Sequence, residues 1–476
     1  MMARVQPCII AAVAATLAAC AGPNGASFGP HSAGVTASLE ASSGQYIKHV
    51  IIVVQENRTY DDLFATFPGG DGATSGFYLK KVGNGYVKTA IKLKMRSLAG
   101  NEDLNHDSKA YNLACDGKDS YPKTSCAMDG FNFIGDNGNN PSNNFAYMYV
   151  NPSDIKPYWD MAKQYGLSDH MFTTQGSGSF TGHFDLVAGT SQLKPSWSLI
   201  DYPNEWADWG CNAPHGTVTA RITTNGHFFP AAPGPNAGPF PCVKFPTKTM
   251  RDLLDGAGLS WKYYTPKYIP GGIGAEWDAF SALSEVYNDP NEWGTNVNWP
   301  ETNVFNDIAN DALPAVSWVI PDSDNSDHPW GPNNHTDNGP SWVASIVNAV
   351  GQSAYWNSTA VIVTWDDFGG YFDHEPPAFF DKMGGLGFRV PMLVVSPYVK
   401  AGTISHTQYE FASILKFVEQ NFGLPSMHTT DDRARSMSDM FDFAQKPRKF
   451  KTIQSALKKE FFIRQPHDAK KKDDDE

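Results

Sequence analysis

The sequence lacks the features that mark several classes of protein. Its 476 residues carry 37 Lys and Arg against 50 Asp and Glu, a net charge of −13, and contain no basic stripe that could follow phosphates. This balance argues against nucleic-acid binding and provides no attraction to anionic membranes, so we ascribe the acidity to a solvated surface. The 6 cysteines show no CxxC or Cys/His spacing, which argues against a structural zinc site. Between the chain ends there is no second linker and no repeat.

The apolar segment after Arg4, VQPCIIAAVAATLAAC, is too short and too rich in alanine for a membrane-spanning helix. It is typical of an export leader. LAAC (residues 17–20) resembles the bacterial lipoprotein cleavage motif, in which Cys20 is lipidated; an ordinary secretory signal cut nearby is the alternative. We therefore predict a signal peptide over 1–19, a small-residue tether over 20–44, and contact with a membrane only through an N-terminal lipid anchor. The exported chain would be periplasmic, attached to the outer membrane, or secreted.

Four cysteines lie beyond the leader and allow three pairings. We predict the pairing of nearest neighbours, Cys115 with Cys126 and Cys211 with Cys242. Each bridge would close a loop in an oxidising compartment.

Apolar runs alternate with helical patterns along the chain. VIIVV, LSWKYY, AVSWVI, TAVIVTW and VPMLVVS are predicted interior strands, and residues 341–352 and 408–423 are predicted helices. Alternation of this kind predicts an α/β fold with a doubly wound, largely parallel sheet and helices on both faces. We expect one domain over 45–447, carrying long active-site loops, and a C-terminal tail over 448–476.

Two of the predicted strands end in adjacent polar side chains. VIIVV leads into Gln55, Glu56 and Asn57, and TAVIVTW leads into Asp366 and Asp367. Ligands of such sheets bind beyond the carboxyl ends of the strands, where neighbouring carboxylates need a cation or a proton between them. Each pair alone could simply cap a loop or helix. Together they form a set of hard oxygen donors that predicts one divalent ion, Mg²⁺, Mn²⁺ or Ca²⁺ rather than Zn²⁺.

A third segment, TTQGSGSFTGHFDLVAGTS (173–191), combines glycines, hydroxyls and a histidine before an apolar run. It is not the G-x-S-x-G elbow of many hydrolases, because Ser177 stands where that motif requires Gly. A serine at such a loop-to-helix junction could be activated by a metal and by helix-terminal amides. Taken alone, the segment is better explained as a glycine-rich loop without chemistry.

These segments together resemble a known family. ENRTYDDLF is similar to the ENRSFDxxFG signature of a bacterial phosphoesterase family that contains non-haemolytic phospholipases C and secreted acid phosphatases. Further similar motifs follow in the family's order over about residues 47–425: DLNH, MDGF, SGSFTGH…AGTS, DHP, WDDFGGYFDHEPP and GFRVPMLVVSPYV.

The resemblance implies an alkaline-phosphatase-like fold with one metal ion. Glu56, Asn57, Asp366 and Asp367 would be its ligands. Ser179 matches the family's nucleophile and would also touch the metal. The implied reaction attacks phosphorus with Ser179, forms a phosphoserine, and releases phosphate with water.

Histidines occupy several of these motifs. His106 and His328 match residues that surround the phosphoryl group, whereas the roles of His183 and His374 are less defined by the resemblance. A histidine there would protonate the leaving group and deprotonate the water. Apart from His328, the segment PDSDNSDH (321–328) is predicted to be a surface loop.

The resemblance favours an acid phosphatase that acts on small phosphorylated substrates. The leader has one Arg rather than a twin-arginine pair, about 50 residues follow the last motif, and SFTGH is more similar to the phosphatase form of the nucleophile segment. Thr181 and Ala65 depart from the family's Pro and Gly, and the first departure concerns the geometry at Ser179. The alternatives are a phospholipase C that cleaves phospholipid headgroups, and a non-catalytic metal-binding surface lipoprotein.

Overall fold

The computed structural model describes residues 44–99, 102–136, 144–204, 210–266, 277–329, 336–381 and 384–465. The predicted signal peptide, Cys20 and nearly all of the tether lie outside the described residues, as do residues 466–476. No described helix combines the length and the apolar character that crossing a membrane requires.

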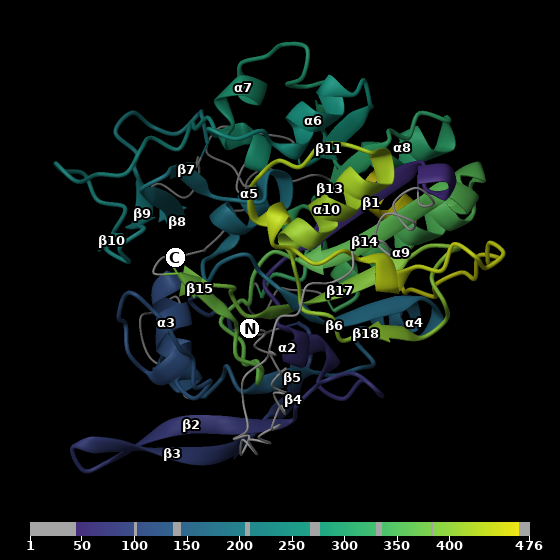
Figure 1. Ribbon diagram of the computed structural model, residues 1–476. Helices are drawn as coiled ribbons and strands as arrows, with labels where there is room; N and C mark the ends of the chain where they lie inside the picture. Colours follow the sequence, from purple (N-terminus) through teal and green to yellow (C-terminus); the bar gives the residue numbers. More distant parts are fainter. Residues whose placement is uncertain are drawn as a thin grey trace, which may run out of the picture.

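A nine-stranded sheet forms the centre of the molecule (Figure 1), in the order β12-β11-β13-β1-β14-β17-β6-β18, with β19 also paired to β6. All five predicted strands lie in this sheet, and only β17 runs antiparallel to its neighbours β14 and β6. The predicted α/β fold with a largely parallel sheet is therefore confirmed. The strands are β1 (His49–Gln55), β6 (Gly166–Phe172), β11 (Trp261–Tyr264), β12 (Val297–Asn298), β13 (Val316–Val319), β14 (Thr359–Trp365), β17 (Arg389–Val395), β18 (Thr403–Ser405) and β19 (Tyr409–Glu410).

Helices pack around this sheet in two groups. One group contains α5, α6 and α10, and the other contains α4, α8, α9 and α11. Both predicted helices are present as α9 and α10, and α10 ends at the predicted Gly423, which adopts a left-handed conformation. The helices are α2 (Tyr60–Phe64), α3 (Ser108–Asp116), α4 (Lys156–Gln164), α5 (Ser179–Ala188), α6 (Met250–Gly256), α7 (Ser284–Tyr287), α8 (Asn303–Ala309), α9 (Asn338–Gly351), α10 (Phe411–Phe422) and α11 (Lys459–Arg464).

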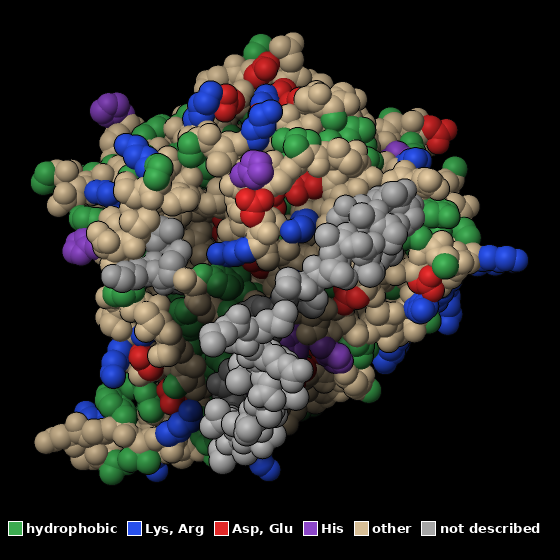
Figure 2. All heavy atoms as spheres, in the orientation of Figure 1, with side chains coloured by type: hydrophobic (Ala, Val, Ile, Leu, Met, Phe, Trp, Pro, Cys, Tyr) green, Lys and Arg blue, Asp and Glu red, His purple; other side chains and the backbone are tan. Residues whose placement is uncertain are grey.

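Short strands in the loops pair to form small sheets outside the central one. The hairpin β2 (Ser75–Val82) and β3 (Gly85–Lys92) extends away from the body at the bottom of Figure 1, and its tip carries exposed Val82, Tyr86 and Val87. Over the rest of the face in Figure 2, acidic and basic side chains are interspersed. The other short strands are β4 (Lys94–Arg96), β5 (Met148–Val150), β7 (Gln192–Lys194), β8 (Trp197–Pro203), β9 (Thr219–Thr223), β10 (Phe228–Phe229), β15 (Phe379–Asp381) and β16 (Gly384–Gly385).

Both predicted disulfides, Cys115–Cys126 and Cys211–Cys242, are present. The segment predicted as a C-terminal tail packs on the domain as far as residue 465. Ile453 and Phe462 are fully buried there, because Phe462 on α11 packs edge-on against a tryptophan of α9.

Candidate functional site

The carboxyl ends of β1 and β14 deliver their polar side chains to one place. The two strands are parallel neighbours, so the residues that follow them leave the sheet side by side. The Asp366 amide donates to the Gln55 carbonyl at 3.0 Å, and the Asn57 amide donates to Asp366 Oδ1 at 2.9 Å. Glu56, Asn57 and Asp366 are fully buried, and Asp367 is 1% exposed. The expected meeting of the two polar pairs is thus observed.

The loops that hold these residues are tightly constrained. Asn57 has φ +60°, a left-handed conformation that non-glycine residues seldom adopt and that often marks functional positions. Gly369, with φ +58°, lies against it so closely that a Cβ there would approach the Asn57 carbonyl oxygen to 2.1 Å. The Gly369 amide donates to Asp367 Oδ1 at 2.8 Å and fixes that carboxylate. Only glycine fits this crossing of the two loops.

Ser179 is the first residue of α5 and joins the same group. Its Oγ donates to Asp367 Oδ2 at 3.1 Å and lies 3.3 Å from Asn57 Oδ1, and the side chain is fully buried. The Tyr202 hydroxyl accepts from the Ser179 amide at 3.1 Å, and Gly178 leaves room for this tyrosine. We call Glu56, Asn57, Ser179, Asp366 and Asp367 the oxygen cluster.

Thr181, which replaces the family's proline, stabilises the start of α5 in another way. Its hydroxyl approaches the Ser177 hydroxyl at 2.7 Å and the Gly178 carbonyl at 3.2 Å. These contacts hold the turn that presents Ser179. The departure is therefore compatible with an ordered helix start.

His106 and His328 border the oxygen cluster. His106 Nδ1 donates to the Leu104 carbonyl at 2.7 Å, which leaves Nε2 facing the cluster, 3.4 Å from Asn57 Nδ2 and 4.0 Å from Asp367 Oδ2. The rings of His106 and His328 are 6.2 Å apart, and Trp277 stacks on His328 at 5.8 Å. Both predicted histidines thus lie beside the oxygen cluster.

His183 and His374 are placed differently. His183 Nε2 lies 3.0 Å from Glu56 Oε1 and 4.0 Å from Asp366 Oδ2. Burial lowers the pKa of His183 to about 4 against the opposing charge of Asp366, so the ring is neutral and can donate to Glu56. His374 contacts Asp61 instead, at 2.7 Å, and belongs to a separate group described below.

The oxygen cluster has the chemistry of a hard cation site. Glu56, His183 and Asp366 offer ligand atoms within 4.8 Å of one another. The Asn57 carboxamide has two orientations: one places its oxygen against the carboxylates, and the other lets its nitrogen donate to Asp366 and Asp367 at 3.1 Å while its oxygen accepts from His328 at 2.7 Å. A cation among the carboxylates would favour the first orientation, because the converging oxygens would then share a positive partner. The residues present therefore fit a divalent ion with oxygen ligands.

Sequence reasoning missed a supporting layer. Arg58 is fully buried; it pairs with Asp62 at 3.1 Å, and its Nε donates to the Asp327 carbonyl at 2.9 Å. The Asp327 side chain accepts from Tyr158 at 2.8 Å and Trp365 at 3.0 Å. Residues 325–328 are therefore buried, which corrects the prediction of a surface loop for 321–328. Two signals in the sequence could have indicated this layer: Arg58 directly follows Asn57, and Asp327 directly precedes His328.

Known proteins share much of this sequence. The chain is 30% identical over 243 residues to phospholipase C B of Mycobacterium tuberculosis, an alignment covering 44% of this chain and 45% of that relative. It is 25% identical over 444 residues to phospholipase C A of the same organism (84% and 78%), and 23% identical over 443 residues to a non-hemolytic phospholipase C of Pseudomonas aeruginosa (84% and 57%). The first alignment thus spans less than half of the relative.

Solved structures show weaker likeness. A protein in the alkaline phosphatase superfamily from Vibrio parahaemolyticus aligns with TM-score 0.33 and 13% identity over 60% of this chain and 65% of the other. The lipoteichoic acid synthase LtaP of Listeria monocytogenes aligns with TM-score 0.34 and 9% identity over 83% and 78%. The Phosphoesterase family itself matches residues 47–425, the span over which the motifs were predicted to extend. The chain belongs to the Phosphoesterase family.

Proposed function

We propose that the protein hydrolyses phosphate esters with Ser179 as the nucleophile. The observation that carries this proposal is the contact of Ser179 Oγ with Asp367 Oδ2 at 3.1 Å, at the first turn of a ten-residue helix. At this distance the Asp367 carboxylate can accept the hydroxyl proton. The amides of the helix start favour the negative charge of a phosphoryl group at that position.

Glu56, Asn57, Asp366 and Asp367, together with Ser179 Oγ, would hold one divalent cation. When bound, the ion would offset the carboxylate charges, lower the pKa of the Ser179 hydroxyl and polarise a phosphoryl oxygen. Its identity among Mg²⁺, Mn²⁺ and Ca²⁺ is left to experiment. His183, neutral and bonded to Glu56, positions that carboxylate rather than taking part in proton transfer.

The side chains support a two-step displacement. Ser179 Oγ forms a bond to phosphorus as the bond to the leaving oxygen breaks, and the serine proton passes to Asp367. His106 or His328 donates a proton to the leaving alkoxide and then accepts one from the water that attacks the phosphoserine. That second step breaks the bond between Ser179 Oγ and phosphorus, releases phosphate, and restores the Ser179 hydroxyl as Asp367 returns its proton.

Small phosphate monoesters are the substrates we propose first. The support is the resemblance of the Ser179-to-His183 segment to the acid phosphatase form, together with two histidines placed to receive a phosphoryl group. A second candidate is phospholipase C activity on phosphodiesters, which the names of the similar mycobacterial and Pseudomonas proteins favour. Export, and a membrane contact through Cys20 alone, remain predictions attached to either activity.

One assay separates these readings. The mature chain and its Ser179→Ala variant are compared on an aryl phosphomonoester, an aryl phosphodiester and phosphatidylcholine, with Ser345→Ala as a control because Ser345 is a buried serine on α9. We expect monoester turnover in the wild type and the control, and a loss of at least about 10³-fold in Ser179→Ala.

Greater turnover of the diester or the phospholipid would establish the second candidate instead. No turnover of any substrate by the metal-loaded chain, with metal still bound, would leave a binding protein. Equal rates for Ser179→Ala and wild type would refute the nucleophile assignment.

A further inference from the structure

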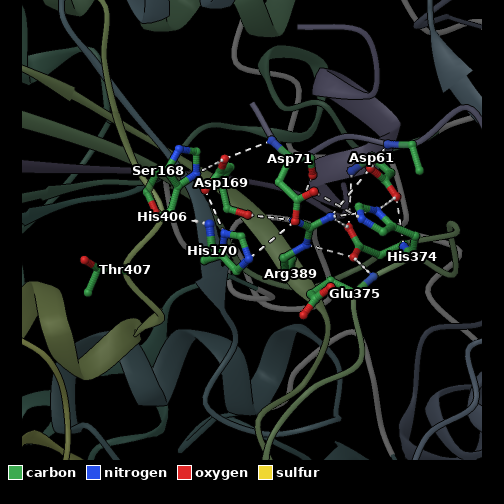
Figure 3. Close-up of polar contacts among 12 residues, drawn as sticks. Asp61, Asp71, Ser168, Asp169, His170, His374, Glu375, Arg389, His406 and Thr407 are labelled. Carbon is green, nitrogen blue, oxygen red and sulfur yellow. Dashed lines mark hydrogen bonds and ion pairs between the residues drawn. The ribbon is translucent and has the colours of Figure 1, made fainter. Parts of the chain in front are cut away.

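A second group of carboxylates and histidines lies at the same edge of the sheet, around the start of β17 (Figure 3). Its members come from the loops after β1 and β14, from β6, and from the segment after β18. We call it the rim cluster: Asp61, Asp71, Asp169, His170, Asp373, His374, Glu375, Arg389 and His406.

Arg389 forms the buried base of the rim cluster. Its guanidinium donates to both carboxylate oxygens of Asp373, at 2.8 and 3.2 Å, and to the backbone carbonyls of Asp169 at 2.8 Å and Asp71 at 3.0 Å. It also lies 4.8 Å from the centre of the Tyr60 ring. One permanent positive charge thus faces the carboxylates of Asp61, Asp71 and Asp373.

Each imidazole of the rim cluster is held through Nδ1 by a fully buried carboxylate. His374 Nδ1 lies 2.7 Å from Asp61 Oδ2, and Asp169 receives His170 Nδ1 on one oxygen and His406 Nδ1 on the other, both at 2.7 Å. A neutral imidazole that donates from Nδ1 presents a lone pair at Nε2. Histidine ligands of metals are commonly oriented in this way by a carboxylate behind them.

The free edge of two imidazoles faces Asp71. His374 Nε2 lies 3.5 Å from Asp71 Oδ1, and His170 Nε2 lies 3.4 Å from Asp71 Oδ2. A good hydrogen bond would bring such atoms to about 2.9 Å. Two ligands held at about 2.1 Å from one tetrahedral ion are separated by about 3.4 Å, which is close to the observed spacing.

Glu375 completes a set of three ligands. Ligand atoms of Asp71, His374 and Glu375 lie within 4.8 Å of one another, and all three residues are partly accessible to solvent. We propose that the rim cluster binds a divalent transition-metal ion, Zn²⁺ by its chemistry, through His374 Nε2 and the carboxylates of Asp71 and Glu375. Water completes the coordination. A mixed nitrogen and oxygen donor set suits this ion, whereas the oxygen cluster suits a harder one.

A proton is the competing occupant. Burial lowers the pKa of His374, but the hydrogen bond to Asp61 and the charges of Asp61 and Asp373 outweigh it and raise that pKa to about 9. A metal ion bound at His374 Nε2 takes the place of a proton at that atom, so binding should strengthen as the pH rises.

The test uses Co²⁺ as a visible probe on the full chain. Wild type, Asp71→Asn, His374→Gln and the control His428→Gln are stripped with a chelator and titrated with Co²⁺ at about pH 8. His428 is a matched control because it also faces a carboxylate, Asp432 at 3.4 Å, but lies 78% exposed and outside the rim cluster. The number of ions bound per chain is compared between wild type and each variant. Ions bound at the oxygen cluster are common to all of them and do not contribute to the difference.

We expect wild type and His428→Gln to bind one more ion per chain than Asp71→Asn and His374→Gln, with a visible absorption band that the two rim variants lack. Asp71 is 42% exposed, so Asp71→Asn should fold even if His374→Gln does not. A footprint on the wild type needs no variant: Zn²⁺ should protect His374, and not His428, from modification by diethylpyrocarbonate. Equal ion counts in wild type and Asp71→Asn, or a His374 that Zn²⁺ fails to protect, would overturn the proposal.

Discussion

The loops that follow β1 and β14 contribute residues to both the oxygen cluster and the rim cluster. Residues 56–61 contribute Glu56 and Asn57 to the first cluster and Asp61 to the second, and residues 366–375 contribute to both in the same order. In the oxygen cluster the carboxylates meet hydroxyl, amide and histidine groups and are almost completely buried. In the rim cluster a permanent guanidinium charge lies against the fully buried carboxylates of Asp61 and Asp373 and against that of Asp71, which is 42% exposed.

This difference separates two uses of buried carboxylates. A cluster neutralised by a fixed arginine is stable as folded and holds its loops together. A cluster of converging oxygens has no such fixed charge at its centre, so all of its carboxylates can bind an incoming cation, whereas in the rim cluster only the partly accessible carboxylates of Asp71 and Glu375 remain for one. We therefore expect changes in the oxygen cluster to affect turnover first and changes in the rim cluster to affect stability first.

The largest effect on turnover should follow Asp366→Asn. Loss of this carboxylate removes a proposed metal ligand and should lower kcat on the best ester substrate by about 10³-fold. The melting temperature should not fall, because the change also removes repulsion between buried carboxylates. Initial rates and thermal melts of the same preparation check both parts, with Glu285→Gln, an exposed carboxylate 45% accessible, as control. A variant that loses stability but keeps its activity would reverse the comparison.

Removal of metal should have a related effect. Dialysis against a strong chelator should abolish turnover, and Mg²⁺, Mn²⁺ or Ca²⁺ should restore it. Rates measured after each ion is added back identify the preferred one. Full activity in a chain shown by elemental analysis to be metal-free would contradict the proposed role of the oxygen cluster.

Arg389→Leu should affect stability most strongly. It would leave Asp373 and Asp61 buried without their guanidinium partner, which costs about 3–5 kcal/mol of unfolding free energy. The matched change is Lys156→Ala, which breaks a surface ion pair between Lys156, 63% exposed, and Asp160. It should lower the unfolding free energy by less than about 1 kcal/mol. Denaturant titrations of both variants measure the contrast. Similar losses would mean that the rim cluster is no more than a surface network.

The smallest effect should come from a buried carboxyl outside both clusters. Burial raises the pKa of Asp278 to about 7, although the amides of Phe280 and Ser281 donate to it and favour the ionised form. The folded chain thus retains a proton that the unfolded chain loses near pH 4, so this contribution to stability is lost as pH rises through about 7.

Asp278→Asn should remove that dependence. Thermal melts between about pH 4 and 8 should fall less steeply for Asp278→Asn than for wild type. Asp322→Asn, which alters a carboxyl that also accepts from a backbone amide at the start of a short helix, serves as the control and should follow wild type. Parallel profiles for wild type and Asp278→Asn would show that the Asp278 carboxyl is ionised in the folded protein.

Sequence patterns predicted the features that depend on residues close together in the chain. Aliphatic runs located five strands of the central sheet, and the polar residues directly after two of them located most of the oxygen cluster. Strand β6 was missed because GLSDHMF carries Ser168, Asp169 and His170 within a strand, which hides the apolar pattern. The contacts of those polar residues depend on β17 and on the segment around His406, which lie beside β6 only in the folded chain.

The rim cluster could not be predicted for the same reason. Its members span residues 61 to 406 and share no spacing, and the family motif that contains His374 left its role undefined. His183 also follows this pattern: its place in a family motif left its role less defined, and its contact with Glu56 depends on the packing of α5 against the loop after β1. Contacts that depend on tertiary packing between distant loops leave little trace in the sequence.

The reversed direction of β17 has a consequence for the order in which the chain acquires its structure. Because this strand runs opposite to β14 and β6, its first residue, Arg389, reaches the edge where the other strands end. Asp61, Asp169 and Asp373 are all synthesised before it. Until β17 inserts between its neighbours, these carboxylates lack the charge that makes their burial favourable, so the loops of both clusters should be among the last parts of a nascent chain to become resistant to proteolysis.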